Sequence, residues 1–555
     1  MGNKLELYNG FYDLENLVTI TITMPDTDWQ ALKAAEPRGG RCKFDYVGDR
    51  FDWYKTTSVS VSGTKLPKTP ATFNGVGVIK KSYCGSFSTT KPSLRLDFGK
   101  YVSSNEAGIE GLIGTKALTL NNCKQDSSYI RQPLGYEIFR QAGLPYARCN
   151  FTKIVVNGTS MGVYLNLEPV KKRFLQRNFA GNDKGNAYEL EFGEDLDPGT
   201  VSAGRISFEG FSDFKDQKDL KLAAEKIAAG GLASAKEVVD MDQFIRLLAM
   251  EALLKHWDGY AKNRNNTYIY NDTVAVATPG PANVKLKFIP CGIDQILKQD
   301  RDFEIGGGGV LAKLVRGDSS WKSKLFGTIR SFADTIFGRN NHDTVLKPFI
   351  DRMETLLISA GVTGAASDIN VVRKQVQLVK SGAYQLIGAF PSEPFMWLSK
   401  STGECMHAST SDLITSGGPP GGPHQEVYHI PIQPGNTAEL WSAVPANSPN
   451  SQLKFKNGAY GTWLHCDAVV KSSGGKPNVY AVKADTGPGN MFTAQPTAVA
   501  SSGMWNASGY WILQSVVMKQ FVYFSEADLT PKGRKNVHLI GDSTDKSQAT
   551  ALFLF

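Results

Sequence analysis

The sequence predicts two folded regions, a mixed α+β region followed by an all-β region. Near the N-terminus, segments such as residues 16–24 alternate β-branched and polar residues, which is typical of strands. In the middle of the chain, segments such as residues 241–256 space apolar residues as an amphipathic helix does. Beyond about residue 388 the chain is rich in Gly, Ser, Trp and Tyr, and helical spacing disappears. A chain of 555 residues is also too long for one ordinary domain.

We therefore expect an α+β domain over residues 1–388, with a β-rich part over about 15–195 and a helical part over about 196–388. Asn157-Gly158 is the preferred two-residue turn of a β-hairpin, so we expect a hairpin around it. Further strands are expected at residues 58–61, 75–81, 93–98, 151–156, 161–167, 267–270 and 284–289.

The remaining residues, 389–555, contain an approximate threefold repeat. Its members are residues 405–408 (CMHA), 463–466 (WLHC) and 521–524 (FVYF), followed downstream by Val427-Tyr428, Val479-Tyr480 and Val537-His538. Three units of short strands predict a β-trefoil-like domain. Because the Gln-x-Trp signature of ricin-type lectins is absent, we favour a domain that recruits a protein partner or substrate over one that binds a glycan.

Composition excludes several classes of protein. The net charge of +8 is mild, and no dense Lys/Arg run carries interleaved aromatic residues, so we expect no nucleic-acid partner. No apolar run approaches the ~18 residues of a membrane span, and the first residues lack the apolar core of a signal peptide. The 7 cysteines are scattered and never form CxxC pairs. This pattern argues against a zinc site or disulfide framework and for a reducing compartment, so we expect a cytoplasmic protein, or one exported without a classical signal peptide.

One constellation in the helical part has the spacing of catalytic chemistry. Asp258 follows the predicted helix 241–256, and Asn263 follows Asp258 by five residues, as in the catalytic loop of kinases. There the aspartate receives or orients the proton of the acceptor hydroxyl, and the asparagine amide oxygen reaches a magnesium ion. Asp294 follows the strand near residues 285–289, where kinases place a second metal ligand.

A wider resemblance supports this interpretation. The segments that carry it are residues 91–96 (KPSLRL), 129–139 (YIRQPLGYEIF), 142–145 (AGLP), 162–175 (GVYLNLEPVKKRFL) and 257–270 (WDGYAKNRNNTYIY). They resemble the CotH family of atypical, spore-coat type protein kinases, in the same order and over roughly residues 15–385. The resemblance implies a divergent protein-kinase-like fold that transfers the γ-phosphate of ATP to serine residues of proteins.

Carried over to this sequence, the resemblance makes Asp258 the catalytic residue and Asn263 and Asp294 the ligands of Mg²⁺ or Mn²⁺. Asn265 and Asn266 belong to the same motif, so either could supply the amide in place of Asn263. For Asn266, a turn residue leading into the next strand is the favoured alternative.

The phosphate-binding lysine is expected in the region where the family reads Gly-x-Arg-x-Lys-Gly. Lys80 and Lys81 end a strand there, but Ile79 and Ser82 depart from the family's Arg and Gly. We favour Lys81, with Lys91 as the second choice. The alternative for each is a solvated lysine at the end of a strand.

Three further residues complete the expected ATP site. Glu168 could orient the lysine as the helix-C glutamate does in kinases, or it could form a structural ion pair with Lys171 or Arg173. Trp257 and Tyr164 could line an apolar slot for adenine, although aromatic side chains more often pack in the core.

The sequence thus predicts an ATP-dependent phosphotransferase that modifies Ser/Thr of an unidentified protein substrate. A nucleotidyl (AMP) transferase or small-molecule kinase on the same fold is one alternative, because kinase-like folds host other chemistry. A non-catalytic adhesin or scaffold protein is another.

Overall fold

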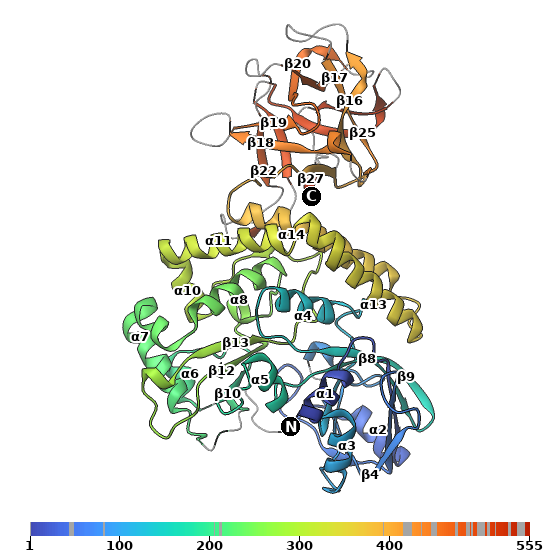
Figure 1. Ribbon diagram of the computed structural model, residues 1–555, viewed down its shortest axis with the longest axis vertical. Coiled ribbons are helices and arrows are strands. Elements are labelled where there is room, and N and C mark those ends of the chain that lie inside the picture. The colour runs from blue at the N-terminus through green and yellow to red at the C-terminus, as the bar shows by residue number, and fades with distance from the viewer. Residues whose placement is uncertain are drawn as a thin grey trace. The chain divides into compact units, whose positions relative to one another are not determined.

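The computed structural model (Figure 1) describes most of the chain. The described residues are 2–43, 49–81, 84–204, 206–209, 212, 214–391, 393–414, 424–433, 436–445, 452–471, 476–483, 489, 492–496, 506–507, 511–516, 518–530, 534–540 and 550–554. None of the described helices has both the length and the apolar character needed to cross a membrane.

The chain divides into two compact units, each of which combines separate segments. Unit 1 contains residues 1–299, 305–328 and 343–373, and unit 2 contains residues 300–304, 329–342 and 374–555. Unit 1 is a mixed α+β structure and unit 2 combines helical segments with a large β-structure. The expected domain boundary after residue 388 stays a prediction.

A nine-stranded sheet forms the N-terminal part of unit 1. Its strands, in spatial order, are β2 (Trp53–Lys55), β5 (Gly77–Lys80), β6 (Leu94–Asp97), β7 (Ala117–Asn121), β9 (Thr159–Leu167), β8 (Cys149–Val156), β1 (Val18–Thr23), β3 (Ser58–Gly63) and β4 (Ala71–Asn74). All neighbours are antiparallel except β1 and β8. The β8–β9 hairpin turns at Asn157 and Gly158, with φ of 49° and 78°, and positive φ at both positions is what its turn type requires.

The core of this part forms because alternate strand residues face the same side of the sheet. Ile20 and Ile22 of β1, Leu96 of β6 and Leu118 of β7 are fully buried in one apolar cluster. Helices α1 (Gly2–Phe11), α2 (Asp26–Ala34) and α3 (Asn105–Ile113) contribute Tyr8, Phe11, Trp29, Leu32 and Ile109 to it. Helix α1, which the sequence analysis did not predict, lies against α3 (Figure 1).

A second, four-stranded sheet lies in the C-terminal part of unit 1. Its order is β11 (Ser207–Phe208), β10 (Ala187–Leu190), β12 (Thr267–Asn271) and β13 (Leu286–Pro290), all antiparallel. Helix α8 (Met241–Leu253) packs on β13, and Figure 1 shows these green strands beside α6 (Pro198–Ser202) and α8. Sequence spacing predicted α8, β12 and β13 within a few residues of their bounds.

The remaining helices are mostly in the second half of the chain. They are α4 (Arg131–Gln141), α5 (Lys172–Asn178), α7 (Lys218–Val238), α9 (Tyr260–Asn263), α10 (Val310–Gly317), α11 (Ser319–Thr335), α12 (Arg339–Asn341), α13 (Lys347–Ser359) and α14 (Ala366–Leu386). A π-helical segment, His342–Leu346, runs directly into α13.

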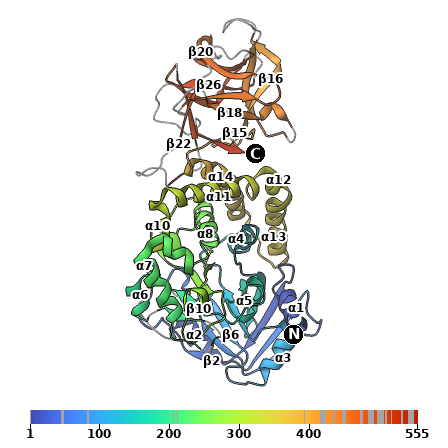
Figure 2. The ribbon, with the colours of Figure 1, turned by 60° about the vertical axis from the view of Figure 1, so that its left-hand side comes forward.

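The β-structure of unit 2 is a nearly closed, barrel-like arrangement of antiparallel strands (Figure 2). Its strands are β15 (Met396–Ser399), β16 (Cys405–Ile414), β17 (His424–Ile430), β18 (Trp441–Pro445), β19 (Leu453–Asn457), β20 (Trp463–Lys471), β21 (Pro477–Val482), β22 (Phe492–Pro496), β24 (Trp511–Ser515), β25 (Phe521–Leu529), β26 (Lys535–Ile540) and β27 (Thr550–Leu554). The short β14 (Phe303–Glu304) and β23 (Asn506–Ala507) pair separately within this unit.

The predicted threefold repeat corresponds to three equivalent hairpins in unit 2. In β16–β17 His407 lies opposite Tyr428, in β20–β21 His465 lies opposite Tyr480, and in β25–β26 Tyr523 lies opposite His538. Each hairpin has a register shift directly after the repeated four-residue segment. The second strands also pair with one another in a cycle, β17 with β21, β21 with β26 and β26 with β17.

Candidate functional site

The loop that carries Asp258 is held in place by the last turn of α8. The buried Glu251 carboxylate accepts the backbone N–H groups of Tyr260 at 3.1 Å and Ala261 at 2.8 Å. These bonds satisfy two of the free N–H groups at the start of α9. They also fix both ends of the loop between α8 and α9, so that Asp258 projects from a closed turn. Burial raises the pKa of the Glu251 carboxyl to about 7.

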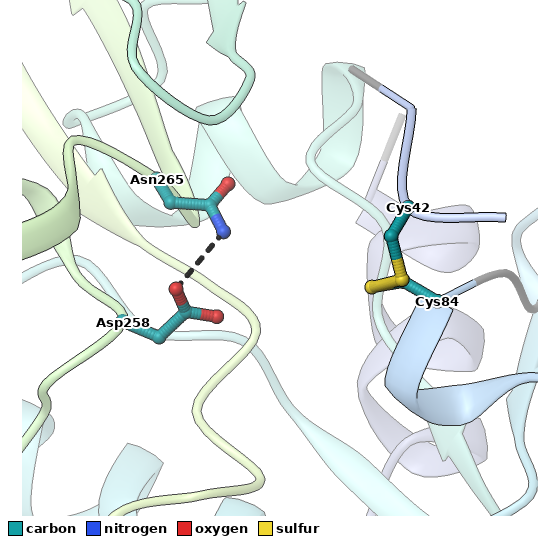
Figure 3. Close-up of a disulfide and its surroundings, with 4 residues drawn as sticks. All are labelled: Cys42, Cys84, Asp258 and Asn265. Atoms are coloured by element: carbon teal, nitrogen blue, oxygen red, sulfur yellow. Dashed lines mark hydrogen bonds between the residues drawn. A yellow bond between two sulfur atoms is a disulfide. The ribbon is translucent and has the colours of Figure 1, made fainter.

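Three asparagine side chains surround the Asp258 carboxylate. Its Oδ1 accepts the side-chain amides of Asn263 at 3.0 Å and Asn265 at 3.2 Å, and its Oδ2 accepts that of Asn266 at 2.9 Å. Figure 3 shows the side chains of Asn265 and Asp258 pointing toward each other. An ionised carboxylate has about four acceptor positions, so roughly one remains for an incoming hydroxyl.

Asn266 also joins this loop to the segment that ends in Asp294. Its backbone carbonyl accepts the N–H of Cys291 at 3.0 Å. Its side-chain Oδ1 lies so close to Gly292 that a Cβ added to that glycine would be only 2.1 Å from it. Asn266 and Gly292 have φ of 48° and 55°, a region that glycine and asparagine tolerate best. The alternative expected for Asn266, a turn residue leading into the next strand, fits this position.

Asp294 lies among other carboxylates. Burial raises the pKa of the Asp294 carboxyl to about 7, the Asp126 and Asp258 carboxylates act in the same direction, and the neighbouring Asn121 side chain opposes them. Asp126 is itself buried and forms an ion pair of 2.6 Å with Arg131, at the start of α4. The structure thus brings Asp258 and Asp294 into one electrostatic neighbourhood, and it adds Asp126 to them.

The donors at this place fit a divalent cation of the magnesium class. Among the described residues, no group of three or more His, Cys, Asp or Glu side chains is arranged to hold a metal ion. Magnesium, however, usually takes one or two carboxylates and completes its shell with water and phosphate oxygens. Burial and, after it, the two nearby carboxylates raise the pKa of Asp294, and a bound cation would stabilise its ionised form. Asp294 and the amide oxygen of Asn263 would hold the ion.

Lys81 stands directly after β5, and its side chain is exposed. Its backbone N–H continues the strand ladder to the carbonyl of Ser93 at 2.8 Å. Its charge lowers the pKa of Glu189 and of Cys291, and the Asp258 carboxylate also acts on Cys291. Lys81 and Asp258 therefore both act electrostatically on Cys291. Ser82 lies outside the described residues.

Lys80 and Lys91, by contrast, have internal partners. The Lys80 amine donates to the backbone carbonyls of Lys33 and Ala35 at 2.9 Å each, so it closes the end of α2. The Lys91 amine donates to the carbonyl of Val163 at 2.7 Å. Burial lowers the pKa of both lysines, that of Lys80 to about 8. Of Lys80, Lys81 and Lys91, only Lys81 has an exposed side chain.

The structure does not bring Glu168 to Lys81. Its buried carboxylate forms an ion pair with Arg177 and accepts the backbone N–H of Arg148 at 2.7 Å. The alternative pairing of Glu168 with Lys171 or Arg173 was also wrong. Lys171 forms an ion pair with Glu209, which directly follows β11, and the Arg173 guanidinium donates to the side chain of Gln176. The sequence could not show which basic residue pairs with Glu168, since Lys171, Arg173 and Arg177 lie within one short stretch.

The aromatic residues proposed for adenine occupy different environments. Tyr164 is fully buried in the core of the nine-stranded sheet, with Lys91 Nζ 4.9 Å from its ring centroid, so neither ring face is open to a nucleotide. Trp257 directly precedes Asp258 and is half-buried, which leaves part of its surface at the loop. Its contact with adenine stays a prediction.

A disulfide joins Cys42 to Cys84 (Figure 3), with Cα atoms 4.5 Å apart. The sequence analysis argued against a disulfide framework and did not predict this single disulfide, so one ground for a reducing compartment is lost. The two residues are 42 positions apart in sequence, in a pattern without CxxC motifs, so cysteine spacing gave no signal. The other five cysteines are free.

Comparison with known proteins identifies the segment that builds this site. Residues 82–308, which contain Lys91, Glu168, Asp258, Asn263 and Asp294, match the family model described as CotH kinase protein. This segment belongs to the CotH family. The match is narrower than the resemblance expected from the sequence, and it begins one residue after Lys81.

One curated CotH-family relative is the inner spore coat protein H of Bacillus subtilis (strain 168), 23% identical over 163 residues. The alignment covers 27% of this chain and 44% of that protein, so the chain spans less than half the length of this relative.

Solved structures similar to part of this chain include a designed threefold symmetric protein, ThreeFoil. It is 13% identical and covers 29% of this chain and 98% of its own, at a TM-score of 0.22. The SDF2-like protein from Arabidopsis thaliana is 14% identical and covers 29% of this chain and 92% of its own, at a TM-score of 0.25.

Three residues of the site were missed by the sequence analysis: Asp126, Glu189 and Tyr268. Asp126 lies in a segment whose residues 129–139 already resembled the CotH family, so its place just before that motif was an available signal. Glu189 lies on β10, a strand the sequence analysis did not predict, and Tyr268 lies directly opposite it on β12.

Proposed function

We propose that this CotH-family protein is an ATP-dependent phosphotransferase with a divergent protein-kinase-like fold, acting on Ser/Thr of a protein substrate. The observation that carries the proposal is the Asp258 carboxylate, which three asparagine amides hold while leaving about one acceptor position. A second carboxyl, Asp294, lies in the same electrostatic neighbourhood.

In the proposed reaction, Asp258 orients the acceptor hydroxyl. The hydroxyl oxygen forms a bond to the γ-phosphorus, and the bond from that phosphorus to the β–γ bridging oxygen breaks with its electron pair leaving on ADP. The hydroxyl proton passes to Asp258 or to the transferred phosphoryl group. Three asparagine N–H donors fix the orientation of the Asp258 carboxylate, which suits it to position the acceptor hydroxyl.

The other residues bind and position the nucleotide. A bound magnesium ion would neutralise charge on the phosphate oxygens. Asp294 and Asn263 would hold the ion, and the exposed amine of Lys81 would contact the phosphates. Such contacts stabilise the charge of phosphoryl transfer, which is the larger part of catalysis in this class of reaction.

We further propose that the β-structure of unit 2 is a β-trefoil that recruits a protein partner. The proposal of this fold rests on strand pairing alone. The unit contains three equivalent hairpins, and the second strands of these hairpins pair with one another in a cycle. The disulfide supports the exported alternative for the location of the protein over the cytoplasmic one.

The test is incorporation of label from γ-labelled ATP with Mg²⁺ or Mn²⁺ into the chain or an added protein. Asp258→Ala and Asp294→Ala should lower incorporation by about 100-fold or more. Glu225→Ala, which removes an exposed carboxylate on α7, is the matched control and should label as the wild type does. Label from α-labelled but not γ-labelled ATP would indicate AMP transfer instead. Absence of both labels and of nucleotide binding would indicate an adhesin or scaffold.

A further inference from the structure

Unit 1 contains a cavity of about 450 Å³ beside helix α4. This α4 cavity is lined by the end of α1 and the residues after it, by α4, by residues 146–149 and by α13. Its volume is in the range of small-molecule binding sites, roughly 300–1,000 Å³. Four of the lining residues carry aromatic rings, namely Tyr12, Tyr136, Tyr146 and Phe349. Such rings offer apolar surface to a flat ligand.

Helix α4 separates this cavity from the segment that carries Asp294. The α4 residues that line the cavity recur every three or four positions and so share one face of the helix: Pro133, Tyr136, Glu137 and Arg140. Gly135 lies on the other face, where an added Cβ would be 2.6 Å from Ile296 and 2.7 Å from Ile293. The α4 cavity is therefore a different place from the site of Asp258 and Asp294.

Four charged side chains line the α4 cavity, and three of them have ionic partners. Glu137 pairs with Arg140 at 2.7 Å, and Asp13 pairs with Lys65 at 2.8 Å. Arg148 is the fourth, and in the part of the chain that the structure describes its guanidinium forms no ion pair. The cavity thus has one positive charge that no carboxylate balances.

The hydrogen bonds of the cavity leave several donors unused. The Arg148 guanidinium has five N–H groups, and among the described residues it donates only to the side-chain oxygen of Asn9. The side-chain N–H groups of Asn9 donate to no described residue. The Tyr12 hydroxyl, buried in the same wall, has no hydrogen-bond partner there either. A carboxylate would match this excess of donors, because it only accepts and because it fits the planar guanidinium with two bonds.

We propose that the α4 cavity binds a small aromatic carboxylate. Its rings would lie against the aromatic walls, and its carboxylate would lie on the guanidinium of Arg148. This site does not depend on the proposed phosphotransfer, since it shares none of the residues assigned to that reaction.

Two ligands that differ only in charge test the proposal: 2-naphthoate, and 2-naphthamide as its neutral counterpart. In calorimetric titrations of the full chain, the wild type should bind 2-naphthoate about 10-fold more tightly than 2-naphthamide. Arg148→Met should weaken 2-naphthoate about 10-fold and change 2-naphthamide by less than about twofold. Arg95→Met removes an exposed arginine on β6 and is the matched control, with the affinities of the wild type. No binding of either ligand, or equal affinities of the wild type for both, would overturn the inference, and this comparison needs no variant.

A second set of titrations tests where the ligand binds. Leu14 lines the cavity and is half-buried, so the larger side chain of Leu14→Trp should fill the space and abolish binding of both ligands. Circular dichroism shows whether this variant is folded. Saturating Mg-ATP should leave the affinity for 2-naphthoate unchanged, because α4 lies between the cavity and Asp294. Unchanged binding by a folded Leu14→Trp variant, or competition with Mg-ATP, would place the ligand elsewhere and contradict the proposal.

Discussion

The side-chain amide of Asn266 donates both to the carboxylate and to the backbone carbonyl of Asp258, at 2.9 Å in each case. Asn266 thus fixes the orientation of the carboxylate and the path of the loop that carries it. Asn265 donates only to the carboxylate, at 3.2 Å. The two asparagines therefore differ in what they hold, although the sequence motif presents them side by side.

Replacing Asn266 with Ala should lower activity more than Asn265→Ala does. Loss of a hydrogen bond to a charged group costs about 1.5–3 kcal/mol, and Asn266 makes that bond and a second one to the backbone. We expect a loss of about 10- to 100-fold in kcat for Asn266→Ala. Phosphotransfer rates of both variants, with circular dichroism to confirm folding, provide the measurement. A larger loss for Asn265→Ala would contradict this role of Asn266.

Gly292→Ala should disturb the same junction from the other side. A Cβ at this position would lie 2.1 Å from Asn266 Oδ1, and the positive φ of 55° adds backbone strain. Gly158→Ala is the matched control, because its φ is also positive, at 78°, while nothing lies within 4 Å of the added Cβ. We expect Gly158→Ala to cost about 1 kcal/mol of unfolding free energy. Gly292→Ala should cost about 2 kcal/mol more and lower activity. Equal costs in urea unfolding would show that the contact with Asn266 is unimportant.

Elements with strong local signals could be predicted from the sequence. The hairpin at Asn157-Gly158 and helix α8 were expected because turn chemistry and apolar spacing are encoded by neighbouring residues. Helix α1 was missed because its apolar residues do not follow the spacing of an amphipathic helix, and packing of Tyr8 and Phe11 into the sheet core stabilises it.

The site was predictable only where its residues are close in sequence. Asp258 and Asn263 belong to one loop, so their spacing carried the information. The partners of lysines and glutamates depend on how distant strands meet. Glu168 was therefore assigned to the wrong partner, and Glu189 was overlooked.

Glu251 should make the stability of unit 1 depend on pH. Burial raises the pKa of its carboxyl to about 7, whereas an unfolded chain titrates near 4.3. Between these values the folded protein retains a proton that the unfolded chain has released, so the stability present below about pH 4.3 is lost as pH rises through about 7. The full difference is on the order of 3 kcal/mol.

Glu251→Gln removes this titration while keeping an acceptor for the N–H of Tyr260 or Ala261. Urea unfolding of both proteins from pH 4.5 to 7.5 gives the test. The free energy of unfolding of the wild type should fall relative to that of the variant as pH rises. Parallel curves would show that Glu251 keeps an ordinary pKa. Asp294 titrates over a similar range in both proteins, so the difference between them isolates Glu251.

Breaking the disulfide should destabilise the segment that leads from α2 to β5 and Lys81. Cys84 lies three residues after Lys81, and the ring of Phe87 lies under the Arg41 guanidinium at 3.9 Å and the Lys80 amine at 4.0 Å. A link that closes 42 residues contributes about 4 kcal/mol by restricting the unfolded chain. Thiol reductant should therefore lower the thermal midpoint of the wild type and weaken Mg-ATP binding through Lys81. The Cys42→Ser/Cys84→Ser double variant should match the reduced wild type, and reductant should not change it. A midpoint that is insensitive to reductant, in a protein whose thiols are shown by mass spectrometry to be reduced, would mean that the packing around Phe87 holds this segment without the covalent link.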